Sequence, residues 1–97
     1  SLYSPIIYAI NDNRTEQQRK DVQMEDKFKN MTKKQLMEVI QKYFNEYNEC
    51  NDCILTGGNK PKEFYVQMAY NYYKACEYKK AGDFKTAWEW YYKDINI

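Results

Sequence analysis

The sequence predicts an all-α fold, a small helical bundle of three to four helices preceded by an extended N-terminal arm or strand. The segments Thr32–Cys50 and Pro61–Ala81 both carry apolar residues at the spacing of one helix face. The three glycines and two prolines, which interrupt helices, lie at the ends of these segments or outside them. A chain of 97 residues has the size of one domain. We therefore expect an arm at residues 1–14 and a single helical domain at 15–97.

The N-terminal arm is apolar and is expected to be extended. Pro5 opposes a helix, and the β-favouring side chains Ile6, Ile7 and Tyr8 follow it. The backbone of a lone strand needs hydrogen-bond partners. It could lie over its own helices, pair across a dimer or extend the sheet of another protein, so Ile6, Ile7 and Tyr8 are candidate partner-binding residues.

Thr15–Lys29 is expected to be a helix that needs a surface to dock on. Thr15 is a residue type that favours the N-cap. Met24, Phe28 and Met31 recur at helical spacing, but most other positions are polar. Such a helix is marginal by itself, so contacts with the rest of the chain must hold it.

Thr32–Cys50 carries a clear amphipathic pattern. Thr32 suits the N-cap, and Gln35 three residues later can complete a capping box. The opposite face is polar, which predicts a helix with one buried side. The expected buried face consists of Leu36, Val39, Ile40, Tyr43, Phe44, Tyr47 and Cys50.

A loop over Asn51–Lys60, broken by two adjacent glycines, is expected to lead into the helix Pro61–Ala81. Pro61 suits the first helical position. The apolar arc of this helix is wide, which predicts a central helix between two neighbours. That arc consists of Phe64, Val66, Met68, Ala69, Tyr72, Tyr73, Ala75 and Cys76.

Gly82 is expected to end this helix as its C′ residue, and Asp83 to cap a last helix from Phe84 to about Ile95. By its spacing, Trp90 is expected to point away from the core. The expected core stripe of this helix is Phe84, Ala87, Trp88, Tyr91 and Ile95.

The segment Ala75–Asp94 resembles the inter-helix turn and second helix of a tetratricopeptide repeat. The residues that carry the resemblance are Ala75, Tyr78, Gly82, Asp83, Phe84, Ala87 and Tyr91. The resemblance covers less than a third of the chain and occurs once. It implies a helical hairpin of the kind used in protein-binding solenoids.

Charge does not favour nucleic acid as a partner. The chain has 15 basic and 14 acidic residues, mixed along its length, whereas phosphate binding normally needs a basic field. A nucleic-acid-associated helical protein remains an alternative, because lysines could act together with stacking rings. Those lysines are Lys74, Lys79, Lys80 and Lys85. No stretch approaches the roughly 20 apolar residues of a membrane span, so we expect no membrane association.

The residue types of catalysis are largely missing, which predicts a protein that is not an enzyme and has no cofactor. Histidine, the commonest general base, is absent. Cys50 and Cys53 form a C-x-x-C pair at an expected helix C-terminus, whereas redox enzymes place this motif at an N-terminus. With Cys76 they offer three zinc ligands where four are needed, so a metal site shared between chains is a further alternative. Three cysteines and the lack of a signal-like leader favour a cytoplasmic protein.

The predicted function is therefore a non-catalytic protein–protein interaction module. Tyrosine accounts for 11 of the 97 residues and aromatics for 18%, and such side chains are enriched at interfaces. Abundant Lys, Asn, Tyr and Ile indicate an AT-rich genome, so a small regulator or inhibitor from a phage or plasmid would fit. The partner is another protein or a second copy in a homodimer. Candidate contacts, besides those in the arm, are Tyr70, Tyr78 and Trp90, which lie on polar helix faces.

Overall fold

The computed structural model describes residues 15–53 and 59–97, and within these ranges the chain forms four helices and no strand. This confirms the all-α prediction. The arm at 1–14, with its candidate contacts Ile6, Ile7 and Tyr8, lies outside the described residues. No helix in the described ranges is both long and apolar enough to cross a bilayer. The helices are α2 (Glu16–Lys29), α3 (Lys33–Asn48), α4 (Lys62–Lys80) and α5 (Phe84–Tyr91).

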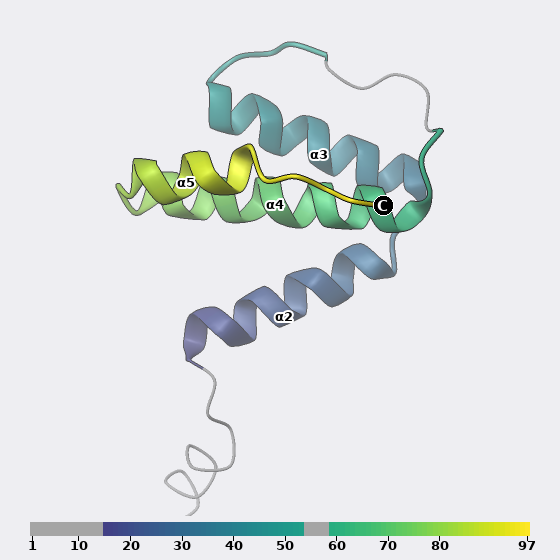
Figure 1. Cartoon of the computed structure of the whole chain (residues 1–97), viewed down its shortest axis with the longest axis horizontal. Helices are drawn as coiled ribbons and strands as arrows, with labels where there is room; N and C mark the ends of the chain where they lie inside the picture. The colour runs from purple at the N-terminus through teal and green to yellow at the C-terminus, as the bar shows by residue number, and fades with distance from the viewer. Residues whose placement is uncertain (1–14, 54–58) are drawn as a thin grey trace, which may run out of the picture.

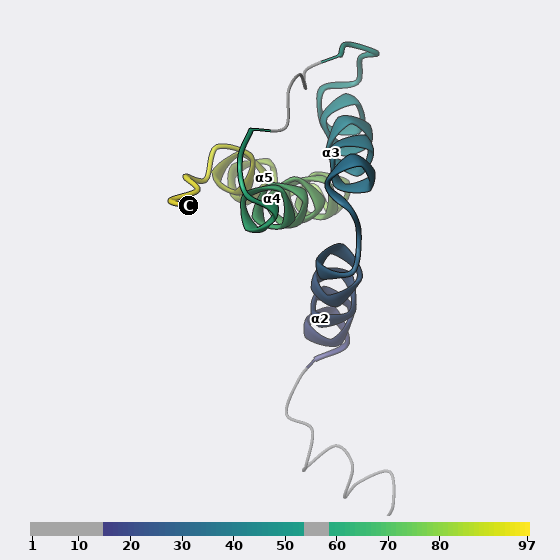
Figure 2. The same ribbon diagram turned by 90° about the vertical axis from the view of Figure 1, so that its right-hand side faces the viewer.

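Helix α4 is the centre of the bundle, and α2, α3 and α5 each pack against it (Figure 1). Helices α3 and α4 run parallel, because Tyr43 meets Cys76 and Glu46 meets Lys80 further along both helices. Helix α5 folds back antiparallel to α4, and Figure 2 shows α2 and α3 on the other side of α4. The apolar pattern predicted two neighbours for α4. There are three, because α2 docks largely through polar side chains.

The predicted starts of α2, α3 and α5 are confirmed, whereas Pro61, predicted as the first residue of its helix, is instead the N-cap of α4. Thr15 and Thr32 each accept a hydrogen bond from the backbone N–H three residues on, and Gln18 and Gln35 complete the two capping boxes. Asp83 accepts a backbone hydrogen bond at the start of α5. These caps satisfy N–H groups that helix geometry leaves unpaired. Short-range sequence signals therefore set where three of the four helices begin.

Helix α5 is shorter than predicted, ending at Tyr91 instead of near Ile95. The last residues run back along α4 in an extended course (Figure 1). If α5 continued, Ile95 would fall on its solvent-exposed side, close to the row of Phe84 and Trp88. In the extended tail Ile95 is instead half-buried beside Phe64 of α4. Burial of this side chain favours ending the helix early.

The core lies where α2, α3 and α4 meet. Phe28, Tyr43 and Tyr73, one from each helix, pack with ring centroids 6.1–6.3 Å apart. Two of the three pairs are edge-to-face, the arrangement that ring quadrupoles favour. Leu36 and Ile40 of α3 are completely buried beside them. Among the described residues of α2, Phe28 is the one fully buried side chain, so α2 has a single apolar anchor.

The turn between α4 and α5 should depend on Gly82. Its φ is +85°, a left-handed conformation that is strained for other residues, although nothing lies within 4 Å of an added Cβ. We expect Gly82→Ala to lower the free energy of unfolding by about 1 kcal/mol. Urea denaturation measures this. Gly82→Asn is the matched control and should lose less, because asparagine tolerates this backbone region; equal losses would contradict backbone strain as the cause.

Candidate functional site

A lysine ammonium group is buried at the interface of α2 and α4. Lys74 Nζ lies 2.5 Å from Asp21 Oδ2, and the two side chains are only 6% and 14% exposed. The Tyr73 hydroxyl donates to Asp21 Oδ1 at 3.0 Å, and the Gln17 amide donates to the same oxygen at 2.8 Å. A buried charge is tolerated only when it is paired and hydrogen-bonded, and Asp21 fulfils both conditions here.

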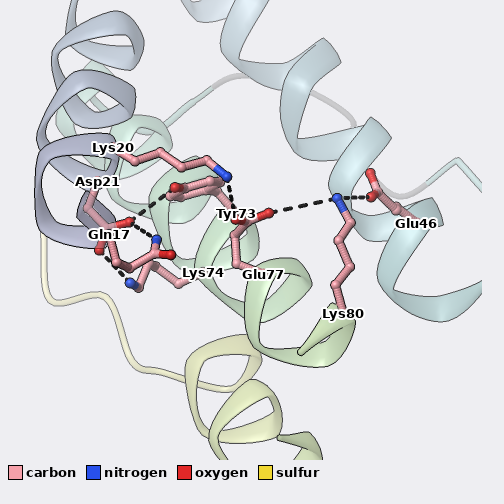
Figure 3. A network of polar contacts seen from close by, with 8 residues as sticks. All are labelled: Gln17, Lys20, Asp21, Glu46, Tyr73, Lys74, Glu77 and Lys80. Atoms are coloured by element: carbon pink, nitrogen blue, oxygen red, sulfur yellow. Dashed lines mark hydrogen bonds and ion pairs between the residues drawn. The ribbon is translucent and has the colours of Figure 1, made fainter. Parts of the chain in front are cut away.

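A second set of polar contacts runs beside this pair across the bundle (Figure 3). Lys20 of α2 pairs with Glu77 of α4 at 2.6 Å, and Glu77 in turn lies 3.7 Å from Lys80. Lys80 reaches Glu46 of α3 at 3.0 Å. These outer pairs are more exposed than the Lys74–Asp21 pair, so each adds little to stability. Together the two sets of contacts connect α2 to α4 and α4 to α3.

The protonation states of the buried pair follow from its surroundings. Burial by itself raises the pKa of Asp21, but hydrogen bonds from Lys74, Gln17 and Tyr73 outweigh it, and the pKa is lowered. Burial and the neighbouring Asp21 carboxylate raise the pKa of Tyr73. At neutral pH Asp21 is therefore an anion and Tyr73 remains a hydrogen-bond donor to it. Proton exchange between these groups is disfavoured, which is typical of a structural pair.

Aromatic rings surround the other side of the Lys74 ammonium. Its Nζ lies 5.1 Å from the Tyr78 ring centroid and 5.7 Å from that of Trp90. Trp90 also packs edge-to-face on Tyr70 at 5.7 Å, and Lys93 lies over its ring at 4.3 Å. The predicted contact residues Tyr70, Tyr78 and Trp90 are thus brought together, and each is half-buried. The expectation that Trp90 points away from the core is wrong, because its ring covers a buried cation.

Three other aromatic side chains are exposed instead. Phe84, Trp88 and Tyr92 are 64%, 58% and 61% exposed and follow one another at four-residue spacing along α5 and its C-cap. We call these three residues the aromatic face. Phe84 and Trp88 were predicted to be core residues, and that prediction is wrong. The buried Ala87 and the half-buried Trp90 turn α5 so that the row of the aromatic face lies toward solvent.

Tyr91 fixes the side of α5 next to the aromatic face. Its ring stacks on Tyr47 of α3 at 4.3 Å and on Tyr72 of α4 at 5.0 Å, with interplanar angles of 9° and 17°. Asn48 donates to the Tyr91 hydroxyl at 3.0 Å. Tyr92 of the aromatic face packs edge-to-face against Tyr91, with centroids 4.9 Å apart. The aromatic face is therefore carried on rings that hold three helices together, which keeps its backbone in place.

A pocket of about 360 Å³ lies beside the aromatic face at the ends of α3 and α4. Phe84 forms one wall, and Tyr47 and Cys76 contribute further apolar surface. Lys79 closes one side by donating to the Tyr47 backbone carbonyl and pairing with Glu49 at 3.0 Å. The pocket is large enough for one aromatic side chain of a partner. It was not anticipated from the sequence, because it depends on the parallel course of α3 and α4.

The lysines that suggested nucleic-acid binding are mostly neutralised. Lys74, Lys79 and Lys80 each lie within 3.0 Å of a carboxylate oxygen, and Lys80 pairs with two carboxylates. Hydrogen bonding to Glu46 raises the pKa of Lys80 further. Phosphate binding draws its free energy from cations that are available to the backbone of the nucleic acid. Lys80 and Lys85 are both exposed, but Lys80 is paired, so Lys85 is the exposed member of the four that forms no ion pair within the described residues.

The three cysteines occupy three different environments. Cys76 is buried with its Sγ 3.4 Å from the Tyr43 carbonyl oxygen, and burial raises the pKa of its thiol to about 12. Cys50 is half-buried beside Asn45, and Cys53 is exposed. In residues 15–53 and 59–97 no three cysteine or carboxylate side chains are grouped as metal ligands. A metal site built on all three thiols would therefore need a second chain or a rearrangement.

Removing the counter-ion of Lys74 should destabilise the fold. We expect Asp21→Asn to lower the free energy of unfolding by about 2–3 kcal/mol, because a buried ammonium loses its charged partner. Asp26→Asn, on an exposed position of the same helix, is the matched control and should change stability by less than about 0.5 kcal/mol.

The difference in the free energy of unfolding between wild type and Asp21→Asn should also depend on pH. The folded-state pKa of Asp21 lies below its unfolded value, so its contribution is complete above about pH 4 and is lost as pH falls through the folded pKa. Urea denaturation at a series of pH values from neutral into acid measures this difference in the free energy of unfolding, which should become smaller as the pH falls. A gap that stayed constant into strong acid would contradict the role of the carboxylate.

Thiol modification should report the cysteine environments. Under native conditions we expect iodoacetamide to label exposed Cys53 first and to leave Cys76 unmodified, because Cys76 is buried and its pKa is raised to about 12. Mass spectrometry after increasing times of labelling gives the order. The same experiment in urea is the control, where all three thiols should react. Labelling of Cys76 as fast as Cys53 in the folded protein would contradict the packing of α3 against α4.

The described residues thus contain an exposed aromatic face, a pocket beside it and a buried ion pair whose lysine contacts Trp90 of α5. Compared with known proteins, the chain matches no family model, no curated protein and no solved structure.

Proposed function

We propose that this protein is a non-catalytic protein–protein interaction module that binds its partner through the aromatic face. The observation that carries the proposal is the exposure of Phe84, Trp88 and Tyr92 in one row of α5. Scattered exposed apolar residues are ordinary, but a contiguous row of large aromatics marks an interaction surface. Tryptophan and tyrosine are also the side chains most enriched among residues that dominate binding energy.

The surroundings of the aromatic face support the same proposal. The pocket beside Phe84 offers a place for a partner side chain, and the charged groups Glu46, Glu49 and Lys79 rim it. An apolar centre with a polar rim is the usual composition of a specific interface. The sequence contains no histidine, and the Lys74–Asp21 pair has a structural role, so neither supplies a catalytic group to this surface. Binding alone is the function that these residues support.

Tyr70, Tyr78 and Trp90, first expected as contact residues, have a supporting part in this proposal. They pack around Lys74 and fix the rotation of α5, so they orient the aromatic face without being part of it. The resemblance of Ala75–Asp94 to the inter-helix turn and second helix of a tetratricopeptide repeat is compatible with a protein-binding role. A small regulator of another protein is one form that this function could take.

Photo-crosslinking tests this proposal. Benzoylphenylalanine placed at position 88 should give discrete crosslinks in an extract of the cells that produce the protein, or with the protein itself. The matched control is the same group at position 22, since Val22 is also exposed but lies on α2. Competition with unlabelled wild-type protein should remove the crosslinks, and unlabelled Trp88→Ala should compete about 30-fold less well, as expected for loss of a dominant contact. Crosslinks that are absent, or equal at both positions, would contradict the proposal.

A further inference from the structure

A charged row runs beside the aromatic face on α5. Lys85 and Glu89 are both exposed, lie four residues apart and follow the same direction as Phe84, Trp88 and Tyr92. Neither Lys85 nor Glu89 forms an ion pair within the described part of the chain. The exposed surface of α5 therefore consists of an aromatic row with one positive and one negative group along its flank.

This pattern is complementary to itself when a second copy approaches in the opposite direction. In an antiparallel helix pair with two-fold symmetry, the same flank of each helix meets its own counterpart in reverse order. Lys85 of one copy then faces Glu89 of the other, and the contact occurs twice. Phe84 faces Tyr92 of the second copy, and the two Trp88 side chains meet near the axis. A parallel two-fold pair would instead place the two Lys85/Glu89 flanks on opposite sides of the contact, where these charges could not pair with each other.

We propose that the aromatic face binds a second copy of this chain, with the two α5 helices antiparallel and each Lys85 paired with Glu89 of the other copy. This inference rests on the proposed function and names the partner of the same surface. The pocket beside Phe84 fits the arrangement, because Tyr92 of the second copy would lie against Phe84 and could enter it. Opposite charges at these positions favour the antiparallel arrangement, because only that arrangement brings Lys85 and Glu89 of the two copies together.

The size of the aromatic face predicts a weak, reversible dimer. Each large aromatic side chain can bury about 150–250 Å², and these three are each about 60% exposed. Together they offer roughly 350 Å² per copy, less than half of the about 800 Å² per partner of a standard interface. The dimer should therefore form in the micromolar range or above, where concentration controls the state of the protein.

Charge reversal tests the arrangement with purified protein alone. Sedimentation equilibrium from about 1 μM to about 1 mM covers the range expected for a small interface. Lys85→Glu and Glu89→Lys should each weaken dimerisation by about tenfold, because each creates two like-charge contacts. The double variant Lys85→Glu, Glu89→Lys restores opposite charges and should return to near the wild-type dimerisation constant. Trp88→Ala should weaken it by about 30-fold or more.

The controls separate folding from association. Circular dichroism should show unchanged helicity in every variant, and Val22→Ala should dimerise as wild type does, since Val22 lies on α2. A wild-type monomer up to about 1 mM, above the range of specific interfaces, would overturn the homodimer. Single reversals without effect, or a double variant that does not recover, would overturn the antiparallel register. If the homodimer is overturned, crosslinks from position 88 to a different protein would still support the proposed function. If position 88 gives no crosslink at all, the proposed function and the homodimer are both contradicted.

Discussion

The ammonium group of Lys74 places the strongest constraint on this fold. It is a charge in the middle of the central helix, and burial there is tolerated only if other elements supply a counter-ion and polarisable surfaces. Helix α2 supplies Asp21, and α5 supplies the Trp90 ring. Both peripheral helices are therefore positioned by one side chain of α4. A hydrophobic residue at position 74 could pack against α4's neighbours, but it would require neither of these contacts.

The orientation of α5 follows from this constraint. With Trp90 turned toward Lys74 and Tyr91 stacked on α3 and α4, the side chains of Phe84 and Trp88 have no room in the core and lie toward solvent. The two aromatic sets of this helix thus have separate roles. One set desolvates a cation and joins helices, and the other is exposed to solvent. Exposed aromatic side chains lower the solubility of a protein unless another molecule buries them, which is the physical reason to regard the aromatic face as a binding surface.

Local sequence signals predicted the helices well because their causes are local. Capping at Thr15, Thr32 and Asp83 and the positive φ at Gly82 depend on a few neighbouring residues. The rotation of α5 could not be predicted in the same way, because Phe84 and Trp88 fit an amphipathic stripe as well as Trp90 and Tyr91 do. The choice depends on the distant residues Lys74 and Tyr47. Ala87 was the available signal, since a small buried residue marks the side on which α5 approaches α4.

The same reasoning explains why α2 was underestimated as a neighbour of α4. Apolar periodicity detects Phe28 but not Asp21, whose contribution exists only when Lys74 is already buried. A polar helix with one apolar anchor is marginal alone, and here its docking completes a charge pair that also holds Trp90 in place. Helix α2 and the aromatic face lie on different parts of the bundle, yet both depend on the same ammonium group. Loosening α2 would therefore weaken the support of α5 without touching a residue of the aromatic face.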